Sequence, residues 1–178
     1  MFTINRFVNW LTVYDNRMFM LINKQWRCRF FDFILPKLTH LGGATFSLSL
    51  LFLLMIFFTN SVRDSAFVAL LSIVASHVAV QLIKKLSCRK RPYIILPDVH
   101  TCQNPLKDYS FPSGHTTATF AIAVVFSIYY PWLMPTLLPL AMLVGISRMY
   151  LGLHYPTDCI IGALIGTVSS IVIVLLLS

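Results

Sequence analysis

Five stretches of the chain are long, apolar and free of Asp, Glu, Lys and Arg. They are Leu41–Phe58, Ser65–Ile83, Ser113–Tyr130, Pro131–Ser147 and Cys159–Ser178. A helix of about 20 apolar residues crosses the hydrocarbon core of a bilayer. The pattern therefore predicts an all-α fold, a polytopic transmembrane helical bundle with five spans.

The N-terminal segment, residues 1–40, has a mixed pattern. The stretch Phe2–Ile22 is rich in apolar and aromatic residues, but Asp15 and Arg17 lie in it, and Phe30–Leu38 is interrupted in the same way. One Asp or Arg costs about 2.5 to 3.5 kcal/mol at the centre of a spanning helix. We therefore expect amphipathic helices that lie in the membrane interface. A sixth span in this segment is the alternative.

The composition agrees with a membrane protein of one domain. Hydrophobic residues make up 57% of the chain and charged residues 11%, whereas about 25% of the residues of a soluble domain are charged. No internal repeat or low-complexity tract divides the chain, so we expect a single domain over residues 1–178, with the helical core over 41–178. The one long polar connection, Cys88–Phe111, is of the kind that usually carries function.

An up-and-down arrangement of these helices brings distant polar residues to one membrane face. The span that ends near Lys84 and the span that begins at Ser113 share a face, and the span that ends near Arg148 returns to it. Three polar clusters are therefore predicted to meet there: Lys84–Pro92, Pro112–His115 and Ser147–Asp158.

The residue types in these clusters are those that bind phosphate. Lys84, Arg91 and Arg148 supply positive charge, and the planar guanidinium group matches the oxygens of a phosphate. Ser113 and Gly114 precede a helix whose first N–H groups lack internal partners and favour an anion. Ser113 either donates its hydroxyl to the phosphate or caps the helix.

Two histidines add chemistry to this phosphate site. His154 lies four residues before Asp158, so one helical turn brings the carboxylate toward the imidazole and leaves the other ring nitrogen as a nucleophile. His115, from a different helix, is placed to act as general acid. The chain contains six Asp and no Glu, and Asp158 is the only carboxylate in the clusters. The site therefore predicts a phosphohistidine intermediate and no metal, since metal-assisted hydrolysis needs several oxygen ligands.

The same residues carry a resemblance to a known family. They are Lys84, six further residues, Arg91 and Pro92; the run Pro112–His115; and Ser147, Arg148, five residues, His154, three residues and Asp158. In order and spacing they resemble the three signatures of the type 2 phosphatidic acid phosphatase superfamily, whose members include integral-membrane lipid phosphatases. The resemblance implies that His154 is the nucleophile, Asp158 its partner and His115 the acid. Lys84, Arg91, Ser113, Gly114 and Arg148 would form the phosphate cradle.

The predicted function is metal-independent hydrolysis of a phosphate group from a membrane lipid phosphate or diphosphate. The resemblance suggests phosphatidic acid, phosphatidylglycerol phosphate or undecaprenyl diphosphate as substrates, and we rank the last two first. The expected partners are this lipid and the bilayer, with no cofactor and no nucleic acid. A binder or carrier of anionic lipid phosphates, which does not hydrolyse them, is the alternative function.

The charge distribution and the resemblance disagree about membrane orientation. In the five-span arrangement all 14 Lys and Arg except Arg63 fall on the face of the site, and the positive-inside rule would place that face in the cytoplasm. The resemblance implies the extracytoplasmic face instead. Phosphate binding accounts for many of these charges, so we favour the extracytoplasmic face of the cell membrane. Cys28, Cys88 and Cys102 lie on the same face, where a disulfide forms only if that side is oxidising.

Two further features of the spans have structural interpretations. His77 shares a helical face with Gln81 and Lys84 through the i, i+4, i+7 spacing, and we expect a hydrogen-bonded core histidine rather than a catalytic one. Gly162 and Gly166 form a pair of small residues one turn apart, which indicates close helix packing within the bundle.

Overall fold

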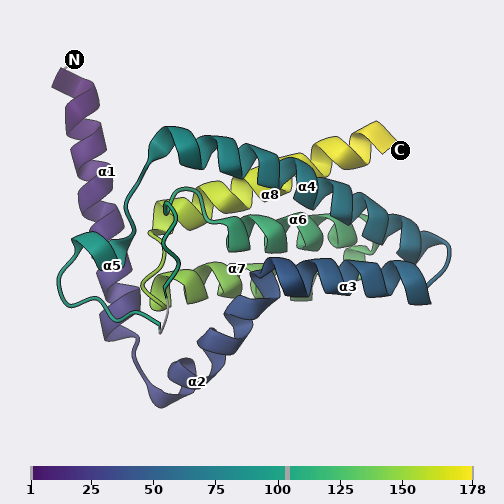
Figure 1. The fold of residues 1–178 in the computed structure, drawn as a ribbon, viewed down its shortest axis with the longest axis horizontal. Coiled ribbons are helices and arrows are strands. Elements are labelled where there is room, and N and C mark those ends of the chain that lie inside the picture. The colour runs from purple at the N-terminus through teal and green to yellow at the C-terminus, as the bar shows by residue number, and fades with distance from the viewer. Residues whose placement is uncertain (1, 103–104, 178) are drawn as a thin grey trace.

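The computed structural model describes residues 2–102 and 105–177, so the two end residues of the predicted domain, Met1 and Ser178, lie outside it. The described chain is helical and contains no strand (Figure 1). Its α-helices are α1 (Phe2–Met20), α2 (Arg29–Leu38), α3 (Ala44–Phe57), α4 (Ser61–Ser87), α5 (Pro92–Ile95), α6 (Gly114–Tyr129), α7 (Met134–Tyr150) and α8 (Pro156–Leu177). Short π- or 3-10-helical segments cover Leu21–Gln25, Thr39–Gly42 and Pro131–Leu133.

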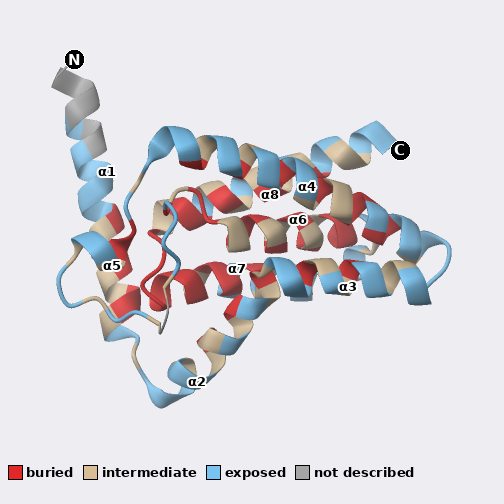
Figure 2. Ribbon diagram, in the orientation of Figure 1, coloured by how far each residue is buried: buried red, intermediate tan, exposed pale blue. Residues whose placement is uncertain are grey.

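The helices α3, α4, α6, α7 and α8 form a bundle with α6 at its centre. Helix α6 packs against α4, α7 and α8, and buried residues run along most of its length (Figure 2). The predicted close packing of the small pair in α8 is confirmed. A Cβ atom on Gly162 would lie 2.6 Å from the backbone oxygen of Ser113, and one on Gly166 would collide with the backbone oxygen of Thr117.

Fewer helices meet the length and hydropathy needed to cross a membrane than the five that the sequence pattern predicts. Helices appear at all five predicted places. Within the described residues, however, three stretches are long and apolar enough to cross a membrane: Ser61–Ile95, Pro131–Tyr150 and Pro156–Leu177. Helix α3 passes only together with Arg29–Gly42, from which it is bent by 60°. At 1.5 Å per residue, helices as short as α3 and α6 span only about 21–24 Å of a core that is about 30 Å thick.

The N-terminal helix α1 runs across the bundle helices at their polar end rather than beside them (Figure 1). Its side chains Trp10, Val13 and Tyr14 are exposed, as expected for a helix that lies in the membrane interface. Asp15, however, is buried. The charge that argues against a span is therefore part of the packing between α1 and the polar end.

The long connection between α4 and α6 folds back over this polar end. The buried side chain of Asn23 holds it there. Its Nδ2 donates to the backbone oxygens of His100 (2.8 Å) and Tyr150 (2.8 Å), and its Oδ1 accepts from the backbone N–H of His100 (3.0 Å). Because one amide side chain joins the connection to the end of α7, the residues that follow His100 are brought near the site.

Candidate active site

The three polar clusters lie together at one end of the bundle. Nη1 of Arg91 is 3.2 Å from Nε2 of His154. The backbone N–H of Ser113 donates to the backbone oxygen of Asp158 over 3.0 Å. Each contact joins residues of different clusters, so the C-terminal end of α4 and the N-terminal ends of α6 and α8 form one site.

His154 and Asp158 face each other, as expected from their four-residue spacing. The distance between the ring and the carboxylate is longer than a normal hydrogen bond. Nδ1 of His154 is 3.5 Å from Oδ2 of Asp158, which is within ion-pair range, but it makes no hydrogen bond within the described chain. The carboxylate is fixed independently of the ring, because Oδ2 accepts the backbone N–H of Tyr155 at 2.8 Å. Nδ1 thus faces the carboxylate, and Nε2 points toward Arg91.

The surroundings of His154 favour the neutral imidazole. The ring is almost completely buried. Burial, and after it the positive charges of Arg148, Arg91 and Lys84, lower the pKa of His154 well below its usual value. A histidine with a lowered pKa keeps a lone pair at neutral pH, which is the state that a nucleophile needs.

Lys84 and Arg91 bind a carboxylate that the sequence analysis did not place in the site. Arg91 is fully buried, and its Nη2 donates to Oδ1 of Asp108 over 2.6 Å while its Nε donates to the backbone oxygen of the same residue. Nζ of Lys84 donates to Oδ2 of Asp108. Partial burial would raise the pKa of Asp108, but hydrogen bonds and charges from Lys84 and Arg91 outweigh it and lower the pKa to about 2. The expectation that Asp158 is the site's only carboxylate is therefore wrong.

Arg148 is buried, and some of its hydrogen-bond donors are unsatisfied within the described chain. Its Nη1 donates to Oγ1 of Thr39 over 2.8 Å, whereas its Nε and Nη2 have no partner within the described chain. Buried donors without an acceptor destabilise a protein, and an anion at the site would satisfy them. This arrangement fits the predicted phosphate contact of Arg148.

Ser113 follows the capping alternative. Its Oγ accepts from the backbone N–H of Thr116 (3.5 Å) and lies 2.9 Å from Oγ1 of the same residue. Gly114 and His115, in contrast, line the cavity at the site. A Cβ atom on Gly42 would lie 2.7 Å from the backbone oxygen of His115, so this glycine allows the Thr39–Gly42 segment to approach α6.

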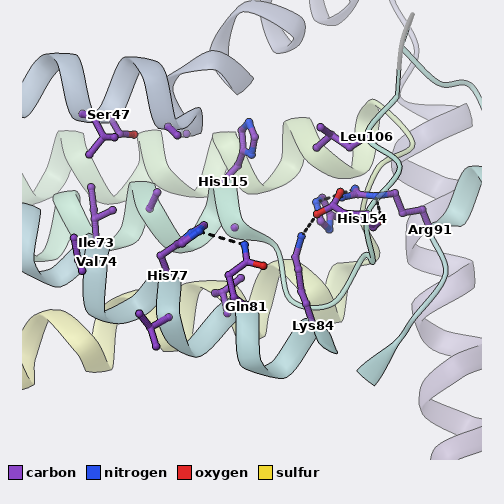
Figure 3. Close-up of a pocket in the computed structure, with 18 residues that line it drawn as sticks. Ser47, Ile73, Val74, His77, Gln81, Lys84, Arg91, Leu106, His115 and His154 are labelled. Carbon is purple, nitrogen blue, oxygen red and sulfur yellow. Dashed lines mark hydrogen bonds and ion pairs between the residues drawn. The ribbon is translucent and has the colours of Figure 1, made fainter. Parts of the chain in front are cut away.

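The cavity has a volume of about 410 Å³ and joins the polar end to the membrane-spanning part of the bundle. Lys84, Arg91 and His154 line one end of it, and His115 lies between this end and the part lined by His77 (Figure 3). The other end lies between α3 and α4 and is lined mostly by apolar side chains: Ala44, Leu48, Ile73, Val74, Val78 and Val80. One cavity thus offers a cationic end, an apolar end and, along its lining, both His154 and His115.

Two further residues that the sequence analysis did not single out as site residues hold Asp158 in place. Arg89 donates from Nη1 to Oδ1 of Asp158 (2.7 Å) and from Nη2 to Oδ2 of Asp15 (2.5 Å). Oδ1 of Asp15 accepts the backbone N–H of Thr157 (2.9 Å) at the start of α8. Arg89 lies within the first signature, but nothing in the sequence pairs it with a residue of α1.

The remaining predictions about side chains near the site have mixed outcomes. His77 is hydrogen-bonded, with its Nε2 3.2 Å from Nε2 of Gln81, but it is exposed and lines the cavity, so the expectation of a core histidine is wrong. Cys28, Cys88 and Cys102 have free thiols. Within residues 2–102 and 105–177, no group of three or more His, Cys, Asp or Glu is placed to hold a metal ion.

Comparison with known proteins identifies the family of the chain. Residues 65–178 match the family model of the PAP2 superfamily. The chain belongs to this superfamily, as its three signatures suggest. Its helices also superpose on the crystal structure of a transmembrane PAP2-type phosphatidylglycerolphosphate phosphatase from Bacillus subtilis, with a TM-score of 0.76 and 25% identity over 93% of this chain and 85% of that chain.

Curated PAP2 relatives have differing names. The chain is 33% identical over 116 residues to the bacitracin transport permease protein BcrC of Bacillus licheniformis. This match covers 64% of this chain and 56% of that protein. It is 31% identical over 116 residues to an undecaprenyl-diphosphatase of Sulfolobus acidocaldarius, with 65% and 55% covered. The chain thus spans about half the length of the curated relatives that it matches.

Proposed function

We propose that this protein is a lipid phosphate phosphatase that works without a metal ion. The observation that carries the proposal is the shared cavity, which is lined by His154, His115, Lys84 and Arg91 and whose other end, between α3 and α4, is mostly apolar. Such a cavity suits a molecule with a phosphate head and a hydrocarbon tail. The named phosphatases among the relatives support the same activity.

The proposed reaction uses the two histidines in different roles. Nε2 of His154 attacks phosphorus, the bond from phosphorus to the lipid oxygen breaks, and His115 gives that oxygen a proton. Water then attacks the phosphohistidine while His115 takes up a proton, and inorganic phosphate leaves with His154 neutral again. Lys84, Arg91 and Arg148 neutralise the charge on the phosphoryl oxygens in both steps.

The incoming phosphate must compete with Asp108 for Lys84 and Arg91. Asp108 is on the connection before α6 and its side chain is half exposed, so it can turn away without disturbing a helix. Asp158, which is buried at the start of α8, stays beside His154. Undecaprenyl diphosphate and phosphatidylglycerol phosphate, which are named for two of the relatives, are the first substrates to test.

The activity is tested with purified protein in detergent, by measuring phosphate release from these lipids in the presence of EDTA. We expect release by the wild type, release at background level by His154→Ala, and a phosphohistidine trapped by a quench in alkaline detergent, in which the P–N bond is stable, in the wild type only. His100→Ala is the matched control, because His100 is exposed and does not line the cavity. Equal release by His154→Ala and the wild type would refute the mechanism.

A carrier of anionic lipids is the second candidate, and the name of the Bacillus licheniformis relative is that of a transport protein. The cationic end and the apolar channel would serve binding equally well. The two functions differ in the same assay. A carrier would bind lipid and release no phosphate, and His154→Ala would leave the number of lipid molecules bound per protein unchanged. A phosphatase would instead hydrolyse the lipid.

We further infer that α4, α7 and α8 cross the cell membrane, that α3 crosses it together with the bent segment Arg29–Gly42, and that the shorter α6 crosses it at the centre of the bundle, with the site on the extracytoplasmic face. The side-by-side packing of the five helices supports this arrangement (Figure 1). Cys88 is exposed at the polar end, so its labelling shows on which side of the membrane the site lies. With Cys28 and Cys102 replaced by Ser, an impermeant maleimide should label Cys88 in intact cells. Labelling only after permeabilisation would place the site in the cytoplasm, and Cys88→Ser is the blank.

A further inference from the structure

A pair of polar side chains lies inside the apolar part of the cavity. His77 and Gln81 of α4 line the cavity together with Lys84, and a hydrogen bond of 3.2 Å joins them (Figure 3). Ser47 is the other polar side chain in this part of the lining of the described chain, and its hydroxyl donates to the backbone oxygen of Leu41. Polar side chains at membrane depth are costly, and they mark binding sites more often than not.

The positions of the pair along α4 set its depth. Gln81 and His77 precede Lys84 by three and seven residues, a spacing that keeps all three on one helical face. At 1.5 Å of rise per residue, their backbones lie about 4.5 and 10 Å further from the polar end than that of Lys84. A lipid whose phosphate is bound at Lys84 therefore places the groups just beyond its phosphate beside this pair.

The chemistry of the pair suits a neutral polar group. Besides Lys84 and Arg91, the residues described as lining the cavity include no further Lys or Arg, so nothing there balances a second phosphate. An amide has two N–H donors and one acceptor oxygen, and an imidazole has two nitrogens. One bond between the two side chains leaves them capacity for a ligand.

The two leading substrate classes differ at this depth. In a glycerophospholipid, the other two glycerol carbons carry acyl chains in ester linkage, one on the carbon next to the one that bears the phosphate and one on the carbon beyond it. In a polyprenyl diphosphate, a second phosphate and then hydrocarbon follow the terminal phosphate. Carbonyl oxygens are neutral acceptors and match the donors of the pair, whereas hydrocarbon would leave these donors without a partner at a cost in binding.

We propose that His77 and Gln81 form a subsite for the ester carbonyls of a glycerophospholipid, so that the enzyme prefers glycerolipid phosphates to polyprenyl diphosphates. The subsite rests on the proposed phosphatase function and refines it. His77 and Gln81 take no part in the chemical step. They determine which lipid binds.

The test compares phosphatidic acid that has two ester-linked chains with its ether-linked analogue of the same chain length, which lacks the carbonyls. Undecaprenyl diphosphate is the third substrate. We expect the wild type to show a KM for the ester lipid about threefold to tenfold lower than for the ether lipid, as one or two neutral hydrogen bonds would give. In His77→Leu and Gln81→Leu the KM for the ester lipid should rise to that of the ether lipid, with kcat unchanged.

Val78→Leu is the matched control, because Val78 is on the same helix and lines the same cavity without a hydrogen-bonding group. It should shift the KM values of ester and ether lipids by the same factor. Thermal unfolding in detergent checks that each variant is folded, and Gln81→Leu tests the subsite alone if His77→Leu does not fold.

The outcomes separate this proposal from the one on which it rests. If the wild type releases phosphate from none of the three lipids, the phosphatase function is wrong and the subsite with it. If it hydrolyses the ester and ether lipids with equal KM, or if the Leu variants weaken both lipids equally, the ester subsite alone is refuted. A lower KM for undecaprenyl diphosphate than for the ester lipid would refute the preference.

Discussion

Asp158 and Asp108, which both bind arginines of the first signature at the polar end, differ in how they are held. Asp158 is buried at the start of α8, where it receives hydrogen bonds from Arg89 and from the backbone N–H of Tyr155. Asp108 is half exposed on a connection and is bound to Lys84 and Arg91 through its side chain. The first carboxylate can only orient a neighbour, whereas the second can be exchanged for another anion. Similar ion pairs therefore give a fixed part and a replaceable part of one site.

The largest effect is expected at the fixed carboxylate. In Asp158→Asn the side chain keeps its size but no longer stabilises the positive charge that develops on His154, so kcat should fall about 10²–10⁴-fold with little change in KM. Phosphate release under saturating lipid measures this fall. A variant with a normal kcat would show that Asp158 is not the partner of the nucleophile.

The next effect tests whether Arg89 acts through Asp158. Arg89→Gln removes a charged donor from the carboxylate, and we expect kcat to fall about tenfold, since a hydrogen bond to a charged group contributes about 1.5 kcal/mol or more. In the Asp158→Asn background the same change should have almost no effect, because the two residues act as one unit. Independent effects that multiply would assign Arg89 a merely structural role. Arg63→Gln, at an exposed position near the start of α4, is the control.

The replaceable carboxylate should respond in the opposite direction. Asp108→Asn frees Lys84 and Arg91 from a competing anion, so inorganic phosphate and vanadate should inhibit about threefold to tenfold more strongly, as expected for one partly exposed charge. Inhibition constants in the lipid assay measure the change. Asp98→Asn is the control, because Asp98 is exposed on the same connection and pairs with Lys24 instead. Weaker inhibition in Asp108→Asn would make Asp108 part of the phosphate site rather than its competitor.

The smallest effect concerns stability at low pH. The pKa of Asp108 is lowered to about 2 from about 3.9 in an unfolded chain. Its stabilising contribution is therefore complete above about pH 4 and is lost as the pH falls toward 2. The difference in melting temperature between the wild type and Asp108→Asn should be small and constant at neutral pH and should vanish near pH 2. A difference in melting temperature that persists near pH 2 would show that it does not come from the charge of Asp108.

The sequence was sufficient for features that depend on neighbours along the chain. The four-residue spacing of His154 and Asp158 brings the two side chains near each other at the start of α8, which begins between them at Pro156. The apolar runs place the polar clusters at helix ends. Uncharged runs were less reliable for counting spans. They mark where apolar residues lie, but the helix α3 begins only at Ala44, after the bend that separates it from the preceding helix.

The roles of Asp15, Arg89 and Asp108 could not be predicted in the same way. Asp15 is an unfavourable charge for a helix in the membrane, and the sequence does not indicate that α1 lies across the bundle and brings this charge to Arg89, 74 residues away. Asp108 reaches Lys84 only because the connection that carries it folds back over the polar end. Long connections have many possible paths, and side-chain contacts such as those of Asn23 select one of them.

The sequence by itself determined the family and the helical membrane-protein class, and it predicted the residues that would carry the chemistry. These properties follow from hydrophobic runs and from residue spacings within a few helical turns. Tertiary structure alone decided which charges meet. It paired Asp158 with Arg89, placed Asp108 against Lys84 and Arg91, and opened one cavity from His154 to His77. The physical reason is that electrostatic and hydrogen-bonding partners are set by distances in space, which the separations along a chain do not specify.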